Sequence, residues 1–223
     1  MIQRGTSSLK RILLLLIAIT VVSGCATTPS KPEPVASSAT KESAQPAIPD
    51  KPVDVWLMPL EGFPPEYARE LEKKFSAELC LNVRATVHAG RTPKMFGPSK
   101  QMLGERVRDE LKVPLQRLYD VTPKTIFVVL TRDDLNSEDG GTRFLFAMHF
   151  PPERLSVVSM ARLSDSFFGK KDTPEVTKLR LYKMVKKAIG TQYYAYPRST
   201  DLKSVMYSPV MSLDDLDAVG TDF

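Results

Sequence analysis

Residues 180–223 read RLYKMVKKAIGTQYYAYPRSTDLKSVMYSPVMSLDDLDAVGTDF, and this stretch is the most informative in the chain. An apolar stripe with steps of three and four residues runs into it and predicts a long amphipathic helix; its members are Val176, Leu179, Tyr182, Val185, Ile189 and Tyr193. A polar turn and the compact sequence SVMYSP follow. The final segment has an acidic head and Leu213, Leu216 and Val219 on one face, which predicts a second, short helix.

The rest of residues 53–223 predicts a single globular domain of the α+β class, with enough chain for one sizeable core. Thr125–Leu130, TIFVVL, has the strongest strand pattern, and its β-branched and aromatic residues predict a central strand. Further strands are expected at Val53–Leu60 and Asn82–His88, and as a pair at Arg143–Phe150 and Leu155–Leu163. Helices are expected after Pro64-Pro65, with Ala68, Leu71, Phe75 and Leu79 facing inward, and from about Ser99, with Pro114 starting a new turn.

Several segments resemble, in order and spacing, the archaemetzincin branch of the metzincin zinc proteases. They are VWLMPLEG (55–62), TIFVVLTRDDL (125–135), FLFAMHFPPERLSVVSMARL (144–163) and the C-terminal stretch with SVMYSP. The resemblance covers nearly all of residues 53–223. It implies a mixed β-sheet with packed helices, an active-site-type helix, a Met-turn and a C-terminal helix, and an edge strand that lines a cleft and can hold an extended peptide. A chance arrangement in another α+β domain is the alternative.

The resemblance also allows the zinc-binding positions to be compared one by one. In metzincins the helix carries H-E-x-x-H-x-x-G-x-x-H. Placing the family's Arg-x-x-Lys on Arg180 and Lys183 puts Lys187 at the first histidine. Ala188 then takes the catalytic glutamate, Thr191 the second histidine, Tyr194 the glycine, and Pro197 the third histidine or its neighbour. Met206 takes the Met-turn position, where turn packing explains it better than a functional sulfur.

These degenerate positions predict that the chain has no zinc, no other cofactor and no catalytic residue of this type. A catalytic zinc needs three protein ligands and an open position, with the glutamate as general base. A lysine ammonium has no lone pair, threonine is a poor ligand, and alanine and proline offer no side-chain donor. A shift of one residue in register changes nothing, because no histidine or cysteine follows His149. The sequence therefore favours a protein that is not an enzyme.

Lys187 and the nearby tyrosines leave alternatives open. Lys187 is expected on a solvated face with Lys186; an ion pair at the former metal position and a catalytic lysine with a lowered pKa are the other readings. Tyr193, Tyr194 and Tyr196 either fill the empty cleft or line it for a ligand, and filling is favoured.

Other chemically capable residues fit structural roles. His88 and His149, the two histidines of the chain, stand at strand ends. Cys80 has apolar neighbours and is expected in the core. The acidic run Asp214, Asp215 and Asp217 follows Ser212, which favours helix capping over a calcium or magnesium site. The pair Asp133-Asp134 is a second possible set of ligands for a hard cation.

The N-terminal residues predict the cellular location of the protein. Arg4, Lys10 and Arg11 precede the apolar run Ile12–Val22, which is too short to span a bilayer and is typical of a secretory signal. Val22-Ser23-Gly24-Cys25 resembles a bacterial lipobox, in which Cys25 becomes the first mature residue and carries acyl chains; an ordinary signal peptide with a chance cysteine is the alternative. Ala26, in place of aspartate, favours the outer membrane in the Gram-negative family.

The predicted organisation is therefore a signal peptide at 1–24, an acylated cysteine with a Pro/Ser/Ala-rich tether at 25–52, and one domain at 53–223. The signal holds three of the 31 basic residues and none of the 26 acidic ones, so the mature chain has a formal charge near +2 and no nucleic-acid partner is expected. With Cys25 acylated, Cys80 has no intramolecular disulfide partner.

Three function classes follow. The favoured one is a non-catalytic, lipid-anchored scaffold that faces the periplasm and binds a protein or peptide. The second is an active metal-dependent peptidase with a rearranged site. The third is a structural envelope protein of unrelated fold.

Overall fold

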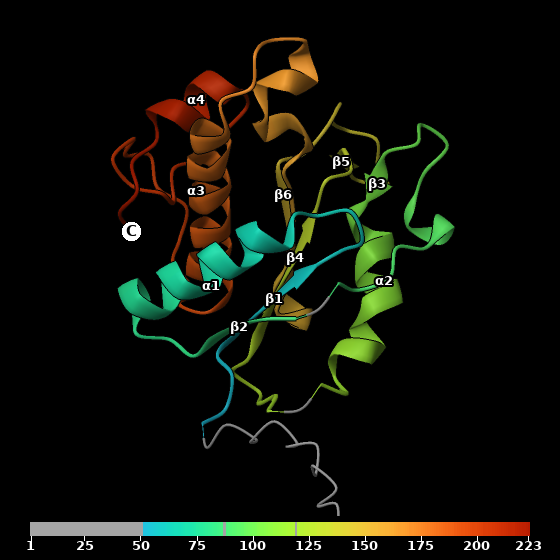
Figure 1. Cartoon of the computed structure of the whole chain (residues 1–223), viewed down its shortest axis with the longest axis vertical. Helices are drawn as coiled ribbons and strands as arrows, with labels where there is room; N and C mark the ends of the chain where they lie inside the picture. Colours follow the sequence, from blue (N-terminus) through green and yellow to red (C-terminus); the bar gives the residue numbers. More distant parts are fainter. Residues whose placement is uncertain (1–50, 87, 119) are drawn as a thin grey trace, which may run out of the picture. The chain divides into compact units, whose positions relative to one another are not determined.

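A computed structural model describes residues 51–86, 88–118 and 120–223 (Figure 1). The predicted signal peptide, Cys25 and most of the tether lie outside these residues. The described residues belong to the compact unit Pro46–Phe223. Within them, no helix combines the length and the apolar character that a membrane crossing requires.

A five-stranded mixed sheet in the order β2-β1-β4-β7-β6 forms the centre of the domain. β1 (Val55–Pro59), β2 (Val83–Ala85), β4 (Ile126–Thr131) and β7 (Leu155–Ser159) run parallel to their neighbours, and β6 (Ala147–Phe150) pairs antiparallel with β7. Every residue of β4 is buried, which confirms the prediction of a central strand. β6 is an edge strand of this sheet.

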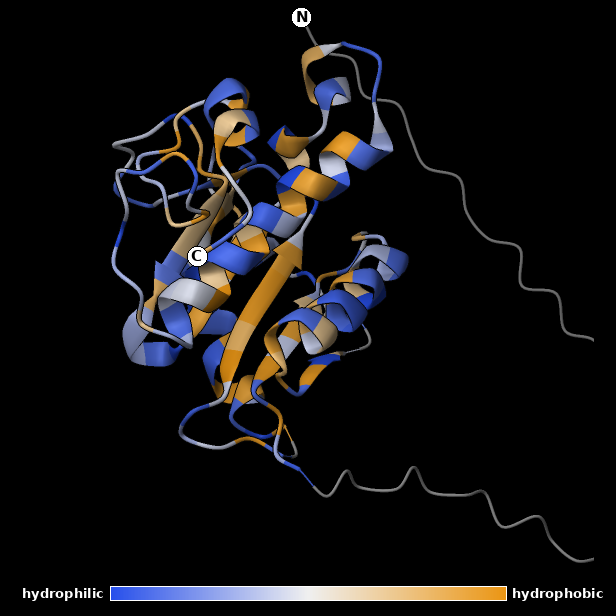
Figure 2. Cartoon of the chain, turned by 90° about the vertical axis from the view of Figure 1, so that its left-hand side faces the viewer, coloured by the Kyte–Doolittle hydropathy of each residue, from blue (hydrophilic) through white to orange (hydrophobic). Residues whose placement is uncertain are grey.

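Helices cover both faces of the sheet, so the domain has a core on each side (Figure 1). α1 (Pro65–Leu79) and α3 (Pro174–Gln192) pack on one face, and α2 (Gly104–Leu115) packs on the other. Successive side chains of a strand point to opposite faces. Val128 therefore belongs to the core under α1 and α3, and Val129 to the core under α2. Figure 2 shows the mainly apolar strands between helices whose outer faces are more hydrophilic.

The second helix begins later than the sequence predicts. Met102–Leu103 form β3, which pairs in parallel with β5 (Leu135–Asn136), so the helix starts at Gly104 rather than near Ser99. Strand pairing with a distant segment overrides the local helical pattern here. A Cβ on Gly104 would lie 2.6 Å from Met148 Sδ, which explains a glycine at this close contact. Pro114 lies inside the last turn of α2 and does not start a new one.

Other expected elements are present with shorter bounds. The strand expected at Asn82–His88 is reduced to β2, and the hairpin strands to β6 and β7 around the 3-10 turn Pro151–Glu153. Leu163 lies in a 3-10 turn, Ala161–Leu163, and two more such turns span Pro93–Met95 and Asp165–Phe168. The short C-terminal helix is α4 (Leu213–Ala218), and Ser212 and Asp215 form the capping box that the acidic run predicts.

Two packing predictions are wrong. Cys80 is exposed, because it caps the C-terminus of α1 in a left-handed conformation with φ 53° and so points away from the core. Leu179 was expected in the buried stripe of α3, but 45% of it is exposed. The buried positions of α3 include several charged residues instead, among them Arg180 and Lys183.

Candidate functional site

The first half of α3 holds α4 through two buried cations. Arg180 donates from Nε and Nη2 to the carboxylate of Asp217 at 2.7 and 2.6 Å, and from Nη1 to Asp165 Oδ1 at 3.0 Å. Lys183 Nζ donates to the carbonyls of Leu216 and Asp217 at 2.9 and 3.1 Å, where α4 ends. These bonds satisfy carbonyls that the end of a helix leaves without partners. The Arg-x-x-Lys pattern thus attaches the C-terminal helix to α3.

Lys186 and Lys187 do not form the solvated face that the sequence predicts. Lys186 is only 4% exposed, and its Nζ lies 2.5 Å from Glu78 Oε1 on α1. Tyr182 donates its hydroxyl hydrogen to the same carboxylate, at 2.7 Å. This cluster joins α1 to α3 and accounts for Lys186 as a structural residue.

Lys187 is half-buried on a different side of the helix, and its ammonium donates to the carbonyl oxygen of Tyr207, in the Met-turn. Burial and the nearby positive charge of Arg198 lower the pKa of Lys187 to about 8. In the described ranges, no carboxylate lies within ion-pair distance of it. The ion pair weighed from the sequence is therefore replaced by a bond to a neutral carbonyl.

The Met-turn packs directly beneath α3. Met206 is 3% exposed, and a Cβ on Gly190 would lie 2.6 Å from its Sδ and 2.7 Å from Phe223 Cε1. Ser199 N donates to the Met206 carbonyl at 3.0 Å, and Ser208 N donates to the Ser199 carbonyl at 3.0 Å. These bonds bring the segment that carries Arg198 beside the turn whose carbonyl binds Lys187.

His149 on the edge strand β6 faces the same region. Its Nδ1 lies 2.8 Å from Ser156 Oγ on β7, and Gln192 Nε2 donates to that oxygen at 3.2 Å and to the Leu155 carbonyl at 2.8 Å. The Ser156 hydroxyl accepts from Gln192, and it either donates to Nδ1 or accepts from it, according to which ring nitrogen carries the proton. Burial and the charges of Lys187 and Arg198 lower the pKa of His149 to about 4, so the ring is neutral near pH 7.

His149, Gln192 and Arg198 were not predicted as site residues. The pairing of His149 with Ser156 follows from the register of the β6–β7 hairpin, which is centred between Pro152 and Glu153; a hairpin centred on Pro151-Pro152 would pair His149 with Arg154 instead. Nothing local in the sequence ties Gln192 to β7, because its partners Leu155 and Ser156 are more than thirty residues away in the chain.

The tyrosines pack together at the end of α3. Tyr194 stacks on Tyr196 with ring centroids 5.2 Å apart, and both contact Phe223, at 5.4 and 5.1 Å. Tyr193 donates its hydroxyl hydrogen to Asp54 Oδ1 at 3.0 Å. These contacts are with Phe223 at the C-terminus and with Asp54 just before β1. The rings therefore form a structural cluster, whereas the sequence favoured tyrosines that fill the empty metal site.

The turn after α3 bears on the register of the degenerate motif. Ala195 has φ 54°, the left-handed conformation that favours glycine, and it stands one residue after Tyr194. In the register shifted by one, Ala188, Ile189, Gln192 and Arg198 take the histidine and glutamate positions. The chain therefore supplies no histidine, cysteine or carboxylate at the ligand positions in either register.

The residues around Lys187 do not fit a zinc ion. Lys187 presents a cation and Tyr207 one neutral carbonyl, whereas zinc binds imidazole, thiolate and carboxylate. Across the part of the chain that the structure describes, no group of three or more His, Cys, Asp or Glu side chains could hold a metal ion. We therefore derive no step through a metal.

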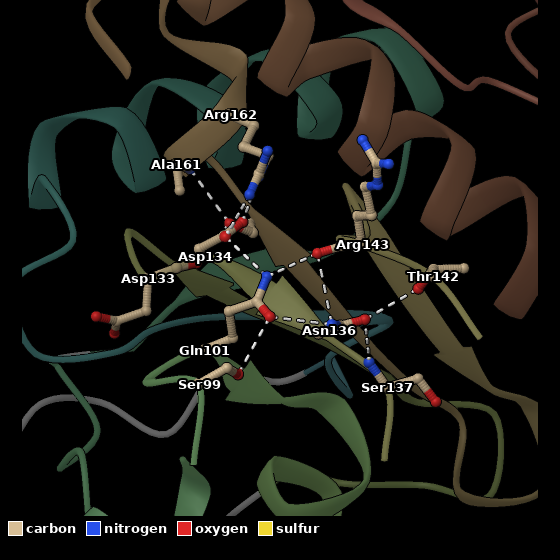
Figure 3. A network of polar contacts seen from close by, with 11 residues as sticks. Ser99, Gln101, Asp133, Asp134, Asn136, Ser137, Thr142, Arg143, Ala161 and Arg162 are labelled. Atoms are coloured by element: carbon tan, nitrogen blue, oxygen red, sulfur yellow. Dashed lines mark hydrogen bonds and ion pairs between the residues drawn. The ribbon is translucent and has the colours of Figure 1, made fainter. Parts of the chain in front are cut away.

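The acidic pairs considered as cation ligands are engaged elsewhere. Asp133 accepts from Arg91 at 2.7 Å, and the carboxylate of Asp134 accepts from Arg162 Nε and Nη2 at 2.7 and 2.8 Å. Gln101 Nε2 also donates to Asp134 and to the Arg143 carbonyl, both at 2.9 Å (Figure 3). This network fixes the segment that leads into β6.

The comparisons with known proteins agree with this geometry. No protein-family model and no curated protein matches the sequence. Among solved structures, a zinc-dependent peptidase from Methanocorpusculum labreanum superposes with a TM-score of 0.65 at 22% identity, over 76% of this chain and 95% of that chain. An archaemetzincin from Methanopyrus kandleri gives 0.61 at 21% identity, over 79% and 92%. An archaemetzincin from Archaeoglobus fulgidus, complexed with malonate, gives 0.59 at 17%, over 76% and 94%.

The domain thus has a metallopeptidase-like fold. Within that class its fold is archaemetzincin-like, as the segments quoted above predict. The hypothesis of an unrelated fold is wrong. At these identities the likeness establishes the fold alone.

Proposed function

We propose that this protein is a lipid-anchored envelope lipoprotein whose archaemetzincin-like domain binds a peptide or protein segment without cleaving it. One observation carries the proposal. Lys187, aligned with the first zinc-binding histidine, donates to the Tyr207 carbonyl of the Met-turn. An ammonium there repels a divalent cation and supplies no lone pair.

The edge strand β6 supplies the binding mode. Ser159 N donates to the Phe146 carbonyl at 2.9 Å, and antiparallel pairs alternate between hydrogen-bonded and non-hydrogen-bonded types. Ala147 and His149, opposite Val158 and Ser156, are therefore non-hydrogen-bonded positions whose backbone groups point to the free edge. An extended peptide can pair with such an edge.

The peptide-binding step is tested at Ala147. The full-length chain is incubated with a mixed peptide library, and peptides that co-elute in size-exclusion chromatography are identified by mass spectrometry. Ala147→Pro removes one outward N–H from an edge position that tolerates proline. We expect several-fold lower retention than for the wild type, whereas Ala147→Ser, which keeps the N–H, retains peptides normally. Equal retention by both variants would rule out the edge strand.

The absence of catalysis is tested on the same preparation. The chain is produced in zinc-supplemented medium, and bound metal is measured by elemental analysis together with cleavage of the library. We expect substoichiometric zinc and intact peptides. Stoichiometric zinc with cleavage would favour the alternative, an active metal-dependent peptidase with a rearranged site. The solved structure from Methanocorpusculum labreanum, which is described as a zinc-dependent peptidase, is the reason for testing this alternative.

The anchor rests on Cys25 and the lipobox-like residues before it. Acylation on both sulfur and amino group holds a protein stably on a bilayer, where one chain is marginal. We expect the wild type in the outer-membrane fraction and labelled by a palmitate analogue. Cys25→Ala should lose the label and leave that fraction, and an unchanged distribution would contradict the anchor.

A further inference from the structure

We infer that the surface beside the Met-turn holds a carboxylate of the bound peptide through the ammonium of Lys187 and the guanidinium of Arg198, with the ring of His149 nearby. The inference rests on the proposed peptide-binding function and adds the chemical group that is recognised. The carboxylate comes from the C-terminus of the peptide or from an aspartate or glutamate side chain, and the experiment separates the two.

The three side chains come together from three parts of the fold. Lys187 on α3 bonds to Tyr207, and the Ser199 backbone bonds on either side of that residue bring Arg198 to the same turn. His149 reaches the region from β6, held by Ser156. α3 packs on β6, and Gln192 of α3 bonds to the same Ser156 hydroxyl as His149, which places the ring on the face of the sheet that α3 covers.

The free hydrogen-bonding groups of Lys187 and Arg198 are all N–H donors. Lys187 uses one of its three N–H groups on Tyr207, which leaves two. Arg198 is exposed, and none of its five N–H donors has a partner among the described residues. A carboxylate, which accepts from several donors at once, complements this set.

The charge of this region is also uncompensated. The pKa of Lys187 and that of His149 are both lowered by burial and by neighbouring cations, and no acidic side chain of the described chain counteracts either shift. Two buried cations of α3 differ in this respect, because Arg180 binds two carboxylates and Lys186 binds one. A half-buried cation without a counter-charge is costly, and an incoming anion removes that cost.

The experiment compares three peptides on the full-length chain purified in nonionic detergent. The first is N-acetyl-tetra-alanine with a free C-terminal carboxylate, the second is its C-terminal amide, and the third is an amide with a central glutamate. Binding is followed by NMR of the histidine side chains. The chain has two histidines, and His88, whose Nε2 lies 2.8 Å from the Phe63 carbonyl, is the internal reference.

We expect at least one carboxylate peptide to bind about tenfold more tightly than the plain amide and to shift the signals of His149 but not of His88. The free acid alone would assign the C-terminus, and the glutamate peptide alone would assign a side chain. Lys187→Met and Arg198→Gln should each abolish most of the preference. Arg132→Gln, which neutralises an exposed arginine outside this surface, should preserve it.

Two results would count against the inference. If all three peptides shift His149 with equal affinity, the surface binds peptides but does not recognise a carboxylate, and only the inference fails. If no peptide shifts His149, both the inference and peptide binding at this surface fail. Arg198 is exposed and the three-peptide comparison uses the wild type, so the outcome does not depend on the folding of the Lys187 variant.

Discussion

The two halves of α3 both carry basic residues but differ in what these residues bind. In the first half, Arg180 and Lys183 are buried, and both bond to α4 and hold it in place. In the second half, Lys186 pairs with Glu78 of α1, whereas Lys187 is half-buried and has one neutral carbonyl as its partner. A helix can therefore keep the bonds that hold neighbouring elements in place while one of its cations lacks a counter-charge. Whether a buried basic residue is stabilised depends on the charge of its partner.

The largest effect on stability is expected from removing Arg180, the cation that binds two carboxylates. Arg180→Met leaves Asp165 and Asp217 without their partner, and we expect the free energy of unfolding to fall by about 3 kcal/mol, the low end for breaking a buried ion pair, because Asp217 is partly exposed. Urea denaturation measures the loss. Arg132→Met, at an exposed position, should change stability by less than about 0.5 kcal/mol. Similar small losses for both would mean that the attachment of α4 is weak.

A smaller loss of stability is expected where the second half of α3 packs on the Met-turn. Gly190→Ala adds a methyl group that would lie 2.6 Å from Met206 Sδ. Overpacking of this kind costs about 2 kcal/mol, and the better helix propensity of alanine offsets up to about 1 kcal/mol. We expect a net loss of about 1 kcal/mol in urea denaturation, by the difference of those two effects. In the background of Met206→Ala the same substitution should be neutral or stabilising, and an undiminished loss there would contradict this contact.

The smallest effect concerns Lys187 and depends on pH. The pKa of Lys187 is lowered from 10.5 to about 8, so the unfolded chain binds more protons at this residue between those values. Stability contributed by this group therefore rises as the pH increases from about 8 to about 10.5. Because Lys187 is only half-buried, solvent screening limits the gain over this window to less than about 1 kcal/mol. Relative to Lys187→Met, the wild type should gain stability across this window and show no gain below it.

The control for this prediction is Lys203→Met, at an exposed lysine. The difference between that variant and the wild type should be flat over the same pH range. A flat difference for Lys187→Met as well would show that Lys187 is fully solvated, and the contrast between the halves of α3 would disappear.

Much of the fold could be predicted because its signals are local. The continuous β-branched run at β4 indicated a fully buried strand, and Ser212 followed by Asp215 indicated a capping box. Element ends were less accurate where a distant partner decides them. Met102 and Leu103 fit a helix by spacing, yet they pair with β5 because that backbone lies beside them in the fold.

For the candidate site, the sequence could predict only that the zinc ligands of the family motif are replaced by other residues. Aligning Lys187, Ala188 and Thr191 with the family motif indicated the lack of zinc ligands, since residue identity decides that question. The solvated Lys186–Lys187 face was wrong because adjacent helical positions point about 100° apart. Lys186 therefore meets Glu78 on α1, and Lys187 meets the Met-turn.

The sequence by itself determined the order of the strands and helices and which chemical groups the chain can present. It places no histidine or cysteine after His149, where the metzincin zinc motif would need its ligands. The tertiary structure alone decided which cations are neutralised and which are not. Glu78 reaches Lys186 across 108 residues of chain, whereas Lys187, one position further along α3, meets a carbonyl beside Arg198. Such partnerships depend on how distant segments pack, and local spacing carries no information about them.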